Sequence, residues 1–151
     1  MTRSENAEFY FTDTFNCSQA VLASFGQDYG LTEDQCLKIS CAFGGGMGRR
    51  QMTCGAVTGA LMVIGLHFGR GAEDPYSQSG IAYENTKVFF REFIKSNGSI
   101  NCKELLQGLD MNDPEDQKKI EELELFRANC VKYVRDAVEI TEKLIQGKSP
   151  L

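Results

Sequence analysis

Four of the six cysteines in this chain directly follow a residue that favours the N-cap of a helix. The pairs are Asn16-Cys17, Thr53-Cys54, Asn101-Cys102 and Asn129-Cys130. A cysteine after such a cap is expected in the first helical turn, where free backbone N–H groups and the helix dipole favour a thiolate. Two of the caps have the pattern of a capping box, Asn16-x-x-Gln19 and Asn101-x-x-Glu104. If the four thiols meet in space, they form a thiol redox centre, a metal site or a cluster site.

Two kinds of chemistry need cysteines in this number. A thiolate attacks disulfides, and thiolates are also the usual ligands of zinc and of iron–sulfur clusters. The four cysteines are separated by 37, 48 and 28 positions, and no C-x-x-C occurs. This spacing argues against a zinc finger, a zinc ribbon, a ferredoxin loop and a thioredoxin motif. It leaves open a site that is assembled from four helix ends, with no cofactor, with an iron–sulfur cluster or with zinc.

A glycine-rich loop, Gly44 to Arg50, precedes Cys54. We predict that Cys54 is the attacking thiol, because it combines a helix N-terminus with two nearby arginines. The arginines suit a thiolate, an anionic substrate or an adjacent cluster, and solvated loop arginines are the simpler alternative. The loop lacks the Gly-Lys-Ser/Thr ending of a P-loop, which argues against a nucleotide phosphate. The candidate substrate-binding residues are Gly45, Gly46, Arg49 and Gly55.

Other residues that could do chemistry have simpler interpretations. Cys36 and Cys41 lie among apolar neighbours, and we expect both in the core. His67 is the only histidine, and a regular helix would place it about 20 Å from Cys54, too far for a general base. Gly55 and Gly59 share one helix face, where either a closely packed helix or a bound group would offset the cost of glycine.

The periodicity of apolar residues predicts helices almost throughout, and no convincing strand. The expected helices cover residues 16–29, 32–43, 54–68, 77–95, 102–107 and 113–146, the last with a break near Asn129. Turns are expected at Gly30, at the glycine loop and at Asn97-Gly98, and Asp113-Pro114 is a helix start. The sequence therefore predicts an all-α fold, a single-domain bundle of about six or seven helices over residues 1–151.

Composition narrows the partners and the compartment. The 151 residues carry a net charge of −5, which argues against nucleic acid as the main partner. The N-terminus has no apolar signal core, and the longest apolar run, 56–66, is too short to span a bilayer. We therefore expect a cytoplasmic protein, in which six cysteines favour catalysis or metal binding over permanent disulfides. The apolar 54–68 helix and the last helix are candidate surfaces for a homodimer.

The order of these motifs resembles the C_GCAxxG_C_C family of redox-active proteins. The resemblance covers nearly the whole chain and rests on Asn16-Cys17-Ser-Gln-Ala-Val21, the glycine loop, Cys54-Gly-Ala-Val-Thr-Gly-Ala60, Gly98-Ser-Ile-Asn-Cys-Lys-Glu-Leu105 and Cys130. It implies that Cys17, Cys54, Cys102 and Cys130 are the functional cysteines. Thr53 stands where the family name has glycine.

Three functions remain open at this stage. The first is a thiol–disulfide oxidoreductase that works with an unidentified redox partner. The second is an electron-transfer or sensor module with an iron–sulfur cluster or zinc. The third, suggested by the transporter genes that often neighbour genes of the family, is a non-catalytic partner of a transporter system.

Overall fold

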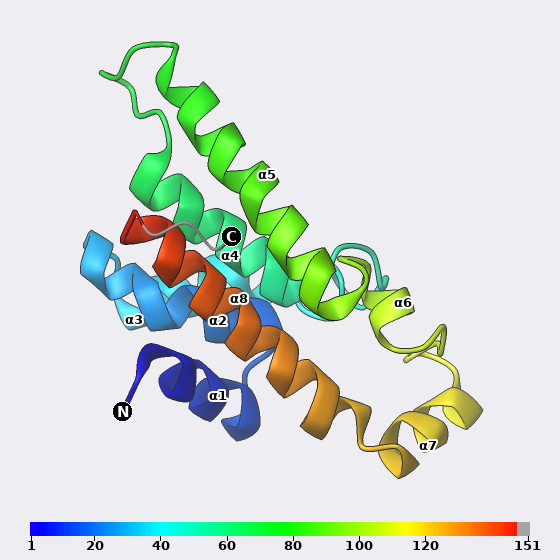
Figure 1. The fold of residues 1–151 in the computed structure, drawn as a ribbon. Helices are drawn as coiled ribbons and strands as arrows, with labels where there is room; N and C mark the ends of the chain where they lie inside the picture. The colour runs from blue at the N-terminus through cyan, green and yellow to red at the C-terminus, as the bar shows by residue number, and fades with distance from the viewer. Residues whose placement is uncertain (148–151) are drawn as a thin grey trace.

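The computed structural model describes residues 1–147, which form an all-α fold without a strand (Figure 1). Its eight α-helices are α1 (Arg3–Asp13), α2 (Cys17–Phe25), α3 (Glu33–Ser40), α4 (Gly55–Phe68), α5 (Gln78–Asn97), α6 (Cys102–Leu105), α7 (Pro114–Glu122) and α8 (Val131–Ile145). Short 3-10 turns follow α2 and α3, at Gly26–Tyr29 and Cys41–Phe43, and a π-helix, Phe126–Cys130, leads into α8. The all-α prediction is confirmed.

Local sequence signals explain where most helices begin. Capping boxes that start from Thr2, Asn16 and Thr32 open α1, α2 and α3. The side chain of Asp113 caps α7, whose first residue is Pro114. The box at Asn16 and a helix that starts at residue 32 agree with the sequence analysis, which did not predict α1.

Glycine and an unexpected turn determine where helices end. Gly30 and Gly98 adopt left-handed backbone conformations, with φ of 87° and 88°, after the 3-10 turn and after α5. The expected break near Asn129 is wrong, because the chain turns earlier, at Leu123–Glu124, where Glu124 has a φ of 52°. The helical conformation then resumes at Leu125 and continues into α8.

The core lies where α2, α4 and α8 meet, and α5 packs along α4 and α8 (Figure 1). Residues 18–25 of α2 are all buried. A side-chain Cβ at Gly59 would lie 2.8 Å from the carbonyl oxygen of Ser18 and 3.0 Å from the Cβ of Val21. The cost of this helical glycine is therefore offset by the close approach of α2 to α4, the first of the two explanations offered for it.

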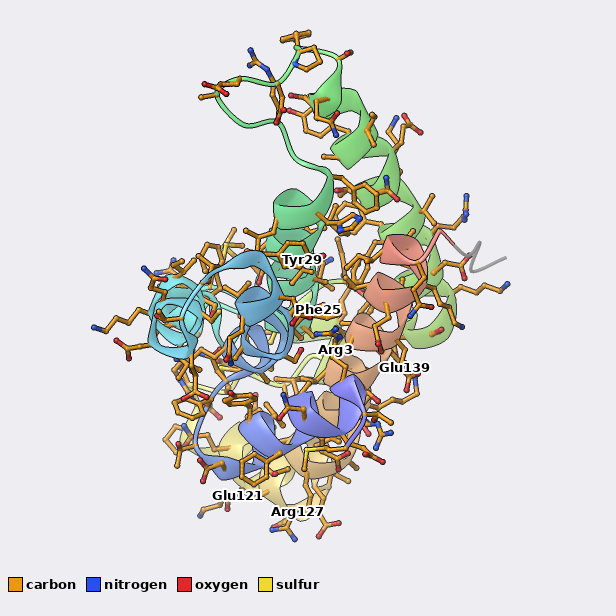
Figure 2. All side chains as sticks on the ribbon, turned by 90° about the vertical axis from the view of Figure 1, so that its left-hand side faces the viewer. Arg3, Phe25, Tyr29, Glu121, Arg127 and Glu139 are labelled. Atoms are coloured by element: carbon orange, nitrogen blue, oxygen red, sulfur yellow. The ribbon has the colours of Figure 1, made fainter. Side chains whose placement is uncertain are left out.

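Arg3 ties α1 to the bundle. Its guanidinium lies 4.4 Å from the ring centre of Phe25, on the side of the molecule that Figure 2 presents. It also donates to the carbonyl oxygen of Ser24 and lies 3.6 Å from a carboxylate oxygen of Glu142 in α8. These contacts hold the start of α1 against α2 and α8.

Within residues 1–147, none of the helices combines the length and apolar character needed to cross a membrane.

Candidate functional site

Cys17 is the first residue of α2. Asn16 caps the helix by accepting the N–H of Gln19 at 3.0 Å, and the Gln19 side chain accepts the N–H of Asn16 at 2.9 Å. The residue is half-buried and lies in the first helical turn, where the sequence predicted it. The position of Cys17 relative to its helix is therefore confirmed.

Cys54 and Cys102 are held together by an isolated antiparallel β-bridge between Thr53 and Asn101. The N–H of Cys54 donates to the carbonyl oxygen of Ile100 at 2.7 Å, beside that bridge. The N–H of Cys102 donates to the carbonyl oxygen of Met52, also at 2.7 Å. Two cysteines 48 positions apart are thus fixed at the ends of one short backbone pairing.

The caps of these two helices differ from the expectation. Cys54 is itself the N-cap of α4, and Thr53 takes part in the bridge instead of capping. Cys102 does begin α6, but Asn101 makes no side-chain cap; its amide donates to the carboxylate of Glu104 at 3.0 Å. The predicted capping box at Asn101 is therefore wrong, because the N–H of Asn101 donates to the hydroxyl of Ser99 at 2.9 Å and Glu104 binds the Asn101 side chain.

Cys130 does not lie at a helix N-terminus. It is the last residue of the π-helix and continues directly into α8, because the preceding break lies at Leu123–Glu124 and not at Asn129. The expectation that a helix dipole stabilises its thiolate is therefore wrong. The π-helix matters in another way, since it carries Cys130 to the thiol of Cys17.

The structure brings the four predicted cysteines close enough for their thiols to affect one another's pKa values. Cys130 raises the pKa of Cys17, and the charge of Cys17 in turn raises the pKa of Cys54 and of Cys102. Tyr133, one helical turn after Cys130, lies near three of these thiols, and its hydroxyl donates to the carbonyl oxygen of Leu105 at 3.0 Å. We call Cys17, Cys54, Cys102 and Cys130 the cysteine site.

The surroundings of Cys17, Cys54 and Cys102 favour their neutral thiol forms. The neighbouring Cys130, together with burial, raises the pKa of Cys17 well above its usual range. Burial also raises the pKa of Cys54, and the N–H groups of Ala56 and Val57 oppose this without overcoming it. The prediction of a low-pKa thiolate at Cys54 is therefore wrong.

Burial also raises the pKa of Cys102, and Arg49 is the arginine that affects this thiol. Burial and the neighbouring Cys17 raise the pKa of Cys102 to about 12, while Arg49 acts to lower it. Arg49 therefore acts on Cys102, and not on Cys54 as the sequence suggested.

A cavity of about 520 Å³ opens onto the cysteine site between the end of α1, the glycine loop, α6 and the start of α8. Three of the four cysteines, Cys17, Cys102 and Cys130, line it, whereas Cys54 does not. The other lining residues are Phe11, Thr12, Thr14, Phe15, Asn16, Gly45, Arg49, Leu106, Met111, Phe126, Arg127 and Val131. A cavity of this size is typical of small-molecule sites.

The predicted substrate-binding residues divide into two groups. Gly45 and Arg49 line the cavity. Gly46 and Gly55 do not, and both permit close approach: a Cβ at Gly46 would lie 2.8 Å from the Cβ of Cys102, and one at Gly55 would lie 3.1 Å from the Cβ of Cys17. These two glycines let the glycine loop and α4 pack directly against the cysteines.

Two positions that support the site were not anticipated. Gln51 is buried, and its side chain donates to the carbonyl oxygen of Leu109 at 2.8 Å and accepts the N–H of Met111 at 2.9 Å. It thereby joins the glycine loop to the segment that carries Met111 into the cavity wall. A lone glutamine gives no sequence signal for such a role, whereas Tyr133 could have been found from its helical spacing to Cys130.

The remaining candidates lie elsewhere. Cys36 is fully buried, as expected, but Cys41 is exposed, because α3 ends at Ser40 and the chain turns outward there. The ring of His67 hydrogen-bonds to the hydroxyl of Tyr29 at 2.8 Å, at the far end of α4 from Cys54. Its assignment as a polar residue at a helix end is consistent with this contact.

No group of three or more His, Cys, Asp or Glu side chains in residues 1–147 has an arrangement that could hold a metal ion. The alternative that the four cysteines bind an iron–sulfur cluster or zinc therefore stays a prediction from residue type.

The model of the family described as "Putative redox-active protein (C_GCAxxG_C_C)" matches residues 15–144 of the chain. The chain belongs to this family. An uncharacterized protein of Archaeoglobus fulgidus is 25% identical over 136 residues, which cover 85% of this chain and 83% of the archaeal protein. No solved structure gives a significant match. The redox description of the C_GCAxxG_C_C family agrees with the convergence of four cysteines beside one cavity.

Proposed function

We propose that this protein performs reversible dithiol–disulfide exchange, with Cys17 and Cys130 as the redox pair. The observation that carries the proposal is that Cys17 and Cys130 line the same cavity, where Cys130 acts directly on Cys17 and raises its pKa. Neighbouring thiols on the wall of one cavity need little backbone movement to form a disulfide. Their exposure to the cavity gives an external disulfide access to either one.

The raised pKa of Cys17 distinguishes the roles of the pair. Cys130, together with burial, favours the protonated form of Cys17, so Cys17 is the poorer first nucleophile. We therefore assign the first attack to Cys130 and the resolving attack to Cys17. The attacking role predicted for Cys54 is not retained, because Cys54 does not line the cavity.

The proposed exchange takes two steps, which together conserve atoms and electrons. The thiolate of Cys130 attacks one sulfur of a substrate disulfide; a mixed disulfide forms, and half of the substrate leaves as a thiolate. Cys17 then gives up its proton and attacks the sulfur of Cys130, which expels the second half as a thiolate. Two electrons pass from the protein to the substrate, and the protons of the two cysteines end on the two product thiols. An external dithiol reverses the sequence and restores the site.

The surroundings of the thiols determine how readily they lose their protons. Burial keeps Cys17 and Cys102 protonated near neutral pH, so the reduced site is protected from indiscriminate oxidation. Arg49 counteracts part of this effect at Cys102. We therefore propose that Cys102 is a further thiol of the cavity wall, able to exchange with the pair when its proton is removed.

The proposal is tested by equilibrating the protein in glutathione buffers of graded redox poise and alkylating the free thiols. We expect one two-electron transition per chain in the wild type and in Cys41→Ser, because Cys41 is exposed and lies outside the cavity lining. The transition should be lost in Cys17→Ser and in Cys130→Ser. An unchanged transition in either of these two variants would refute the assignment.

The same preparation separates the proposal from the cluster alternative. Protein purified without oxygen should contain titratable thiols and substoichiometric iron and sulfide. Stoichiometric iron with acid-labile sulfide, lost when one of the four cysteines is replaced, would support the cluster instead.

A further inference from the structure

We infer that the substrate of the cysteine site is a small disulfide with an anionic group and an apolar body. This inference rests on the proposed function and adds the chemical class of the molecule that exchanges with Cys130. It follows from the lining of the cavity, from the charges around it and from its size.

The walls of the cavity are mostly apolar. Phe11 and Phe15 contribute from the end of α1 and the turn after it, and Leu106, Met111 and Phe126 contribute from the opposite side. Phe126 is 40% exposed, which is high for a large apolar side chain that lies beside a buried thiol. An apolar ligand body would remove this surface from water and stabilise the complex.

Both charged residues that line the cavity are arginines, Arg49 and Arg127. In the described residues, 1–147, the ion pairs of this chain involve neither of them. The Arg49 guanidinium makes one contact, at 3.3 Å to the carbonyl oxygen of Met111. Arg127 is exposed at the end of the molecule formed by the turn after α7 and the start of α8 (Figure 2).

This local charge is opposite in sign to the charge of the whole protein. The chain has a net charge of −5, yet among residues 1–147 no aspartate or glutamate lines this cavity. A carboxylate entering the cavity would meet two cations without displacing an existing ion pair. Unpaired guanidinium groups also suit the thiolate that leaves during exchange.

The two arginines reach the cavity from different elements, Arg49 from the glycine loop and Arg127 from the π-helix. Arg127 lies in the same π-helix as Cys130, and both residues line the cavity. Arg49 comes from the glycine loop and influences Cys102. A ligand that fits the cavity of about 520 Å³ can therefore place its sulfur at Cys130 and its carboxylate between the arginines. A small molecule fits this volume, and a folded protein domain does not.

The inference is tested with two aromatic disulfides of similar size. Dithiobis(nitrobenzoate) carries one carboxylate on each half, whereas dithiodipyridine is uncharged at neutral pH. The ratio of their second-order rates of oxidation of the cysteine site is measured by stopped flow, since the ratio cancels effects on thiol reactivity. The variants are Arg127→Gln and Arg49→Gln. Arg50→Gln is the matched control, because Arg50 is an exposed arginine of the same loop that does not line the cavity.

We expect the ratio of anionic to neutral rate to fall roughly two- to fivefold in Arg127→Gln and in Arg49→Gln, the range for exposed charge pairs. It should stay unchanged in Arg50→Gln and be restored in Arg127→Lys. Added salt should lower the wild-type ratio toward that of the variants.

The outcomes also separate this inference from the function on which it rests. If dithiodipyridine forms the disulfide and the rate ratio is the same in all variants, the anionic substrate class is wrong while the exchange activity stands. If neither reagent produces an intramolecular disulfide, the proposed function itself is overturned.

Discussion

The glycine loop offers a direct test of how the backbone positions Cys102. Gly46 has a φ of +70°, and a Cβ there would lie 2.6 Å from the amide nitrogen of Met52, 2.7 Å from the Cα of Gln51 and 2.8 Å from the Cβ of Cys102. The carbonyl oxygen of Met52 accepts the N–H of Cys102. Any shift of Met52 is therefore passed on to the cysteine.

Gly48 in the same loop provides a matched control. Its φ is +60°, but a Cβ there would meet no atom within 4 Å. Alanine at a left-handed position costs about 1–2 kcal/mol, and the restricted unfolded chain returns about 0.4–1 kcal/mol. Gly48→Ala should therefore lower the free energy of unfolding by about 1 kcal/mol. In Gly46→Ala the overlap adds about 1–3 kcal/mol, for a total of roughly 2–4 kcal/mol.

The assay combines urea unfolding with the alkylation rate of individual cysteines under native conditions. Gly46→Ala should be the less stable variant and should also alkylate Cys102 faster than the wild type, since the thiol loses its packing. Gly48→Ala should leave the alkylation of Cys102 unchanged. Equal losses of stability in the two variants, with equal reactivity of Cys102, would refute the close approach at Gly46.

Three further predictions concern stability. Burial raises the pKa of Cys54, so above about pH 9 the unfolded chain loses the thiol proton before the folded protein does. The free energy of unfolding should then fall by up to about 1.4 kcal/mol per pH unit, and urea unfolding should show a shallower fall in Cys54→Ala. A Cys17–Cys130 disulfide closes a loop on the order of 100 residues and should stabilise the oxidised protein by about 4–5 kcal/mol, seen as a higher Tm than that of the reduced protein and absent in Cys17→Ser. Gly59→Ala should destabilise by about 1–3 kcal/mol because α2 fills its Cβ space, whereas Gly65→Ala, with no atom within 4 Å, should stabilise by about 0.5–1 kcal/mol; thermal or urea unfolding compares the two.

Features encoded within a few residues could be predicted from the sequence. The capping box at Asn16 placed Cys17, Gly98 ended α5, and Asp113-Pro114 began α7. The helix α1 was missed, although Thr2 and Glu5 form a capping box that could have indicated it. Its apolar face is weak, and its attachment depends on long-range contacts of Arg3.

Features set by long-range contacts could not be predicted in this way. The Thr53–Asn101 bridge makes Cys54 a cap instead of a first-turn residue. The helix dipole argument for Cys54 was sound locally, since the N–H groups of Ala56 and Val57 do act to lower its pKa. Burial by distant segments outweighs them, and no local pattern reports that burial.

The pairing of the cysteines likewise could not be predicted from the sequence. Six cysteines allow 15 full pairings, and the motif order alone gives no preference among them. The π-helix that brings Cys130 to Cys17 follows a turn whose key residue, Glu124, has an unusual positive φ. Nothing in its residue type predicts that conformation.

The most direct test of the account is to locate the disulfide. The reduced protein would be oxidised with one equivalent of a neutral disulfide, its remaining thiols alkylated, and its peptides mapped by mass spectrometry without reduction. The account predicts a single cross-linked peptide pair that joins Cys17 to Cys130. A disulfide confined to Cys36 and Cys41, or no intramolecular disulfide at all, would contradict it.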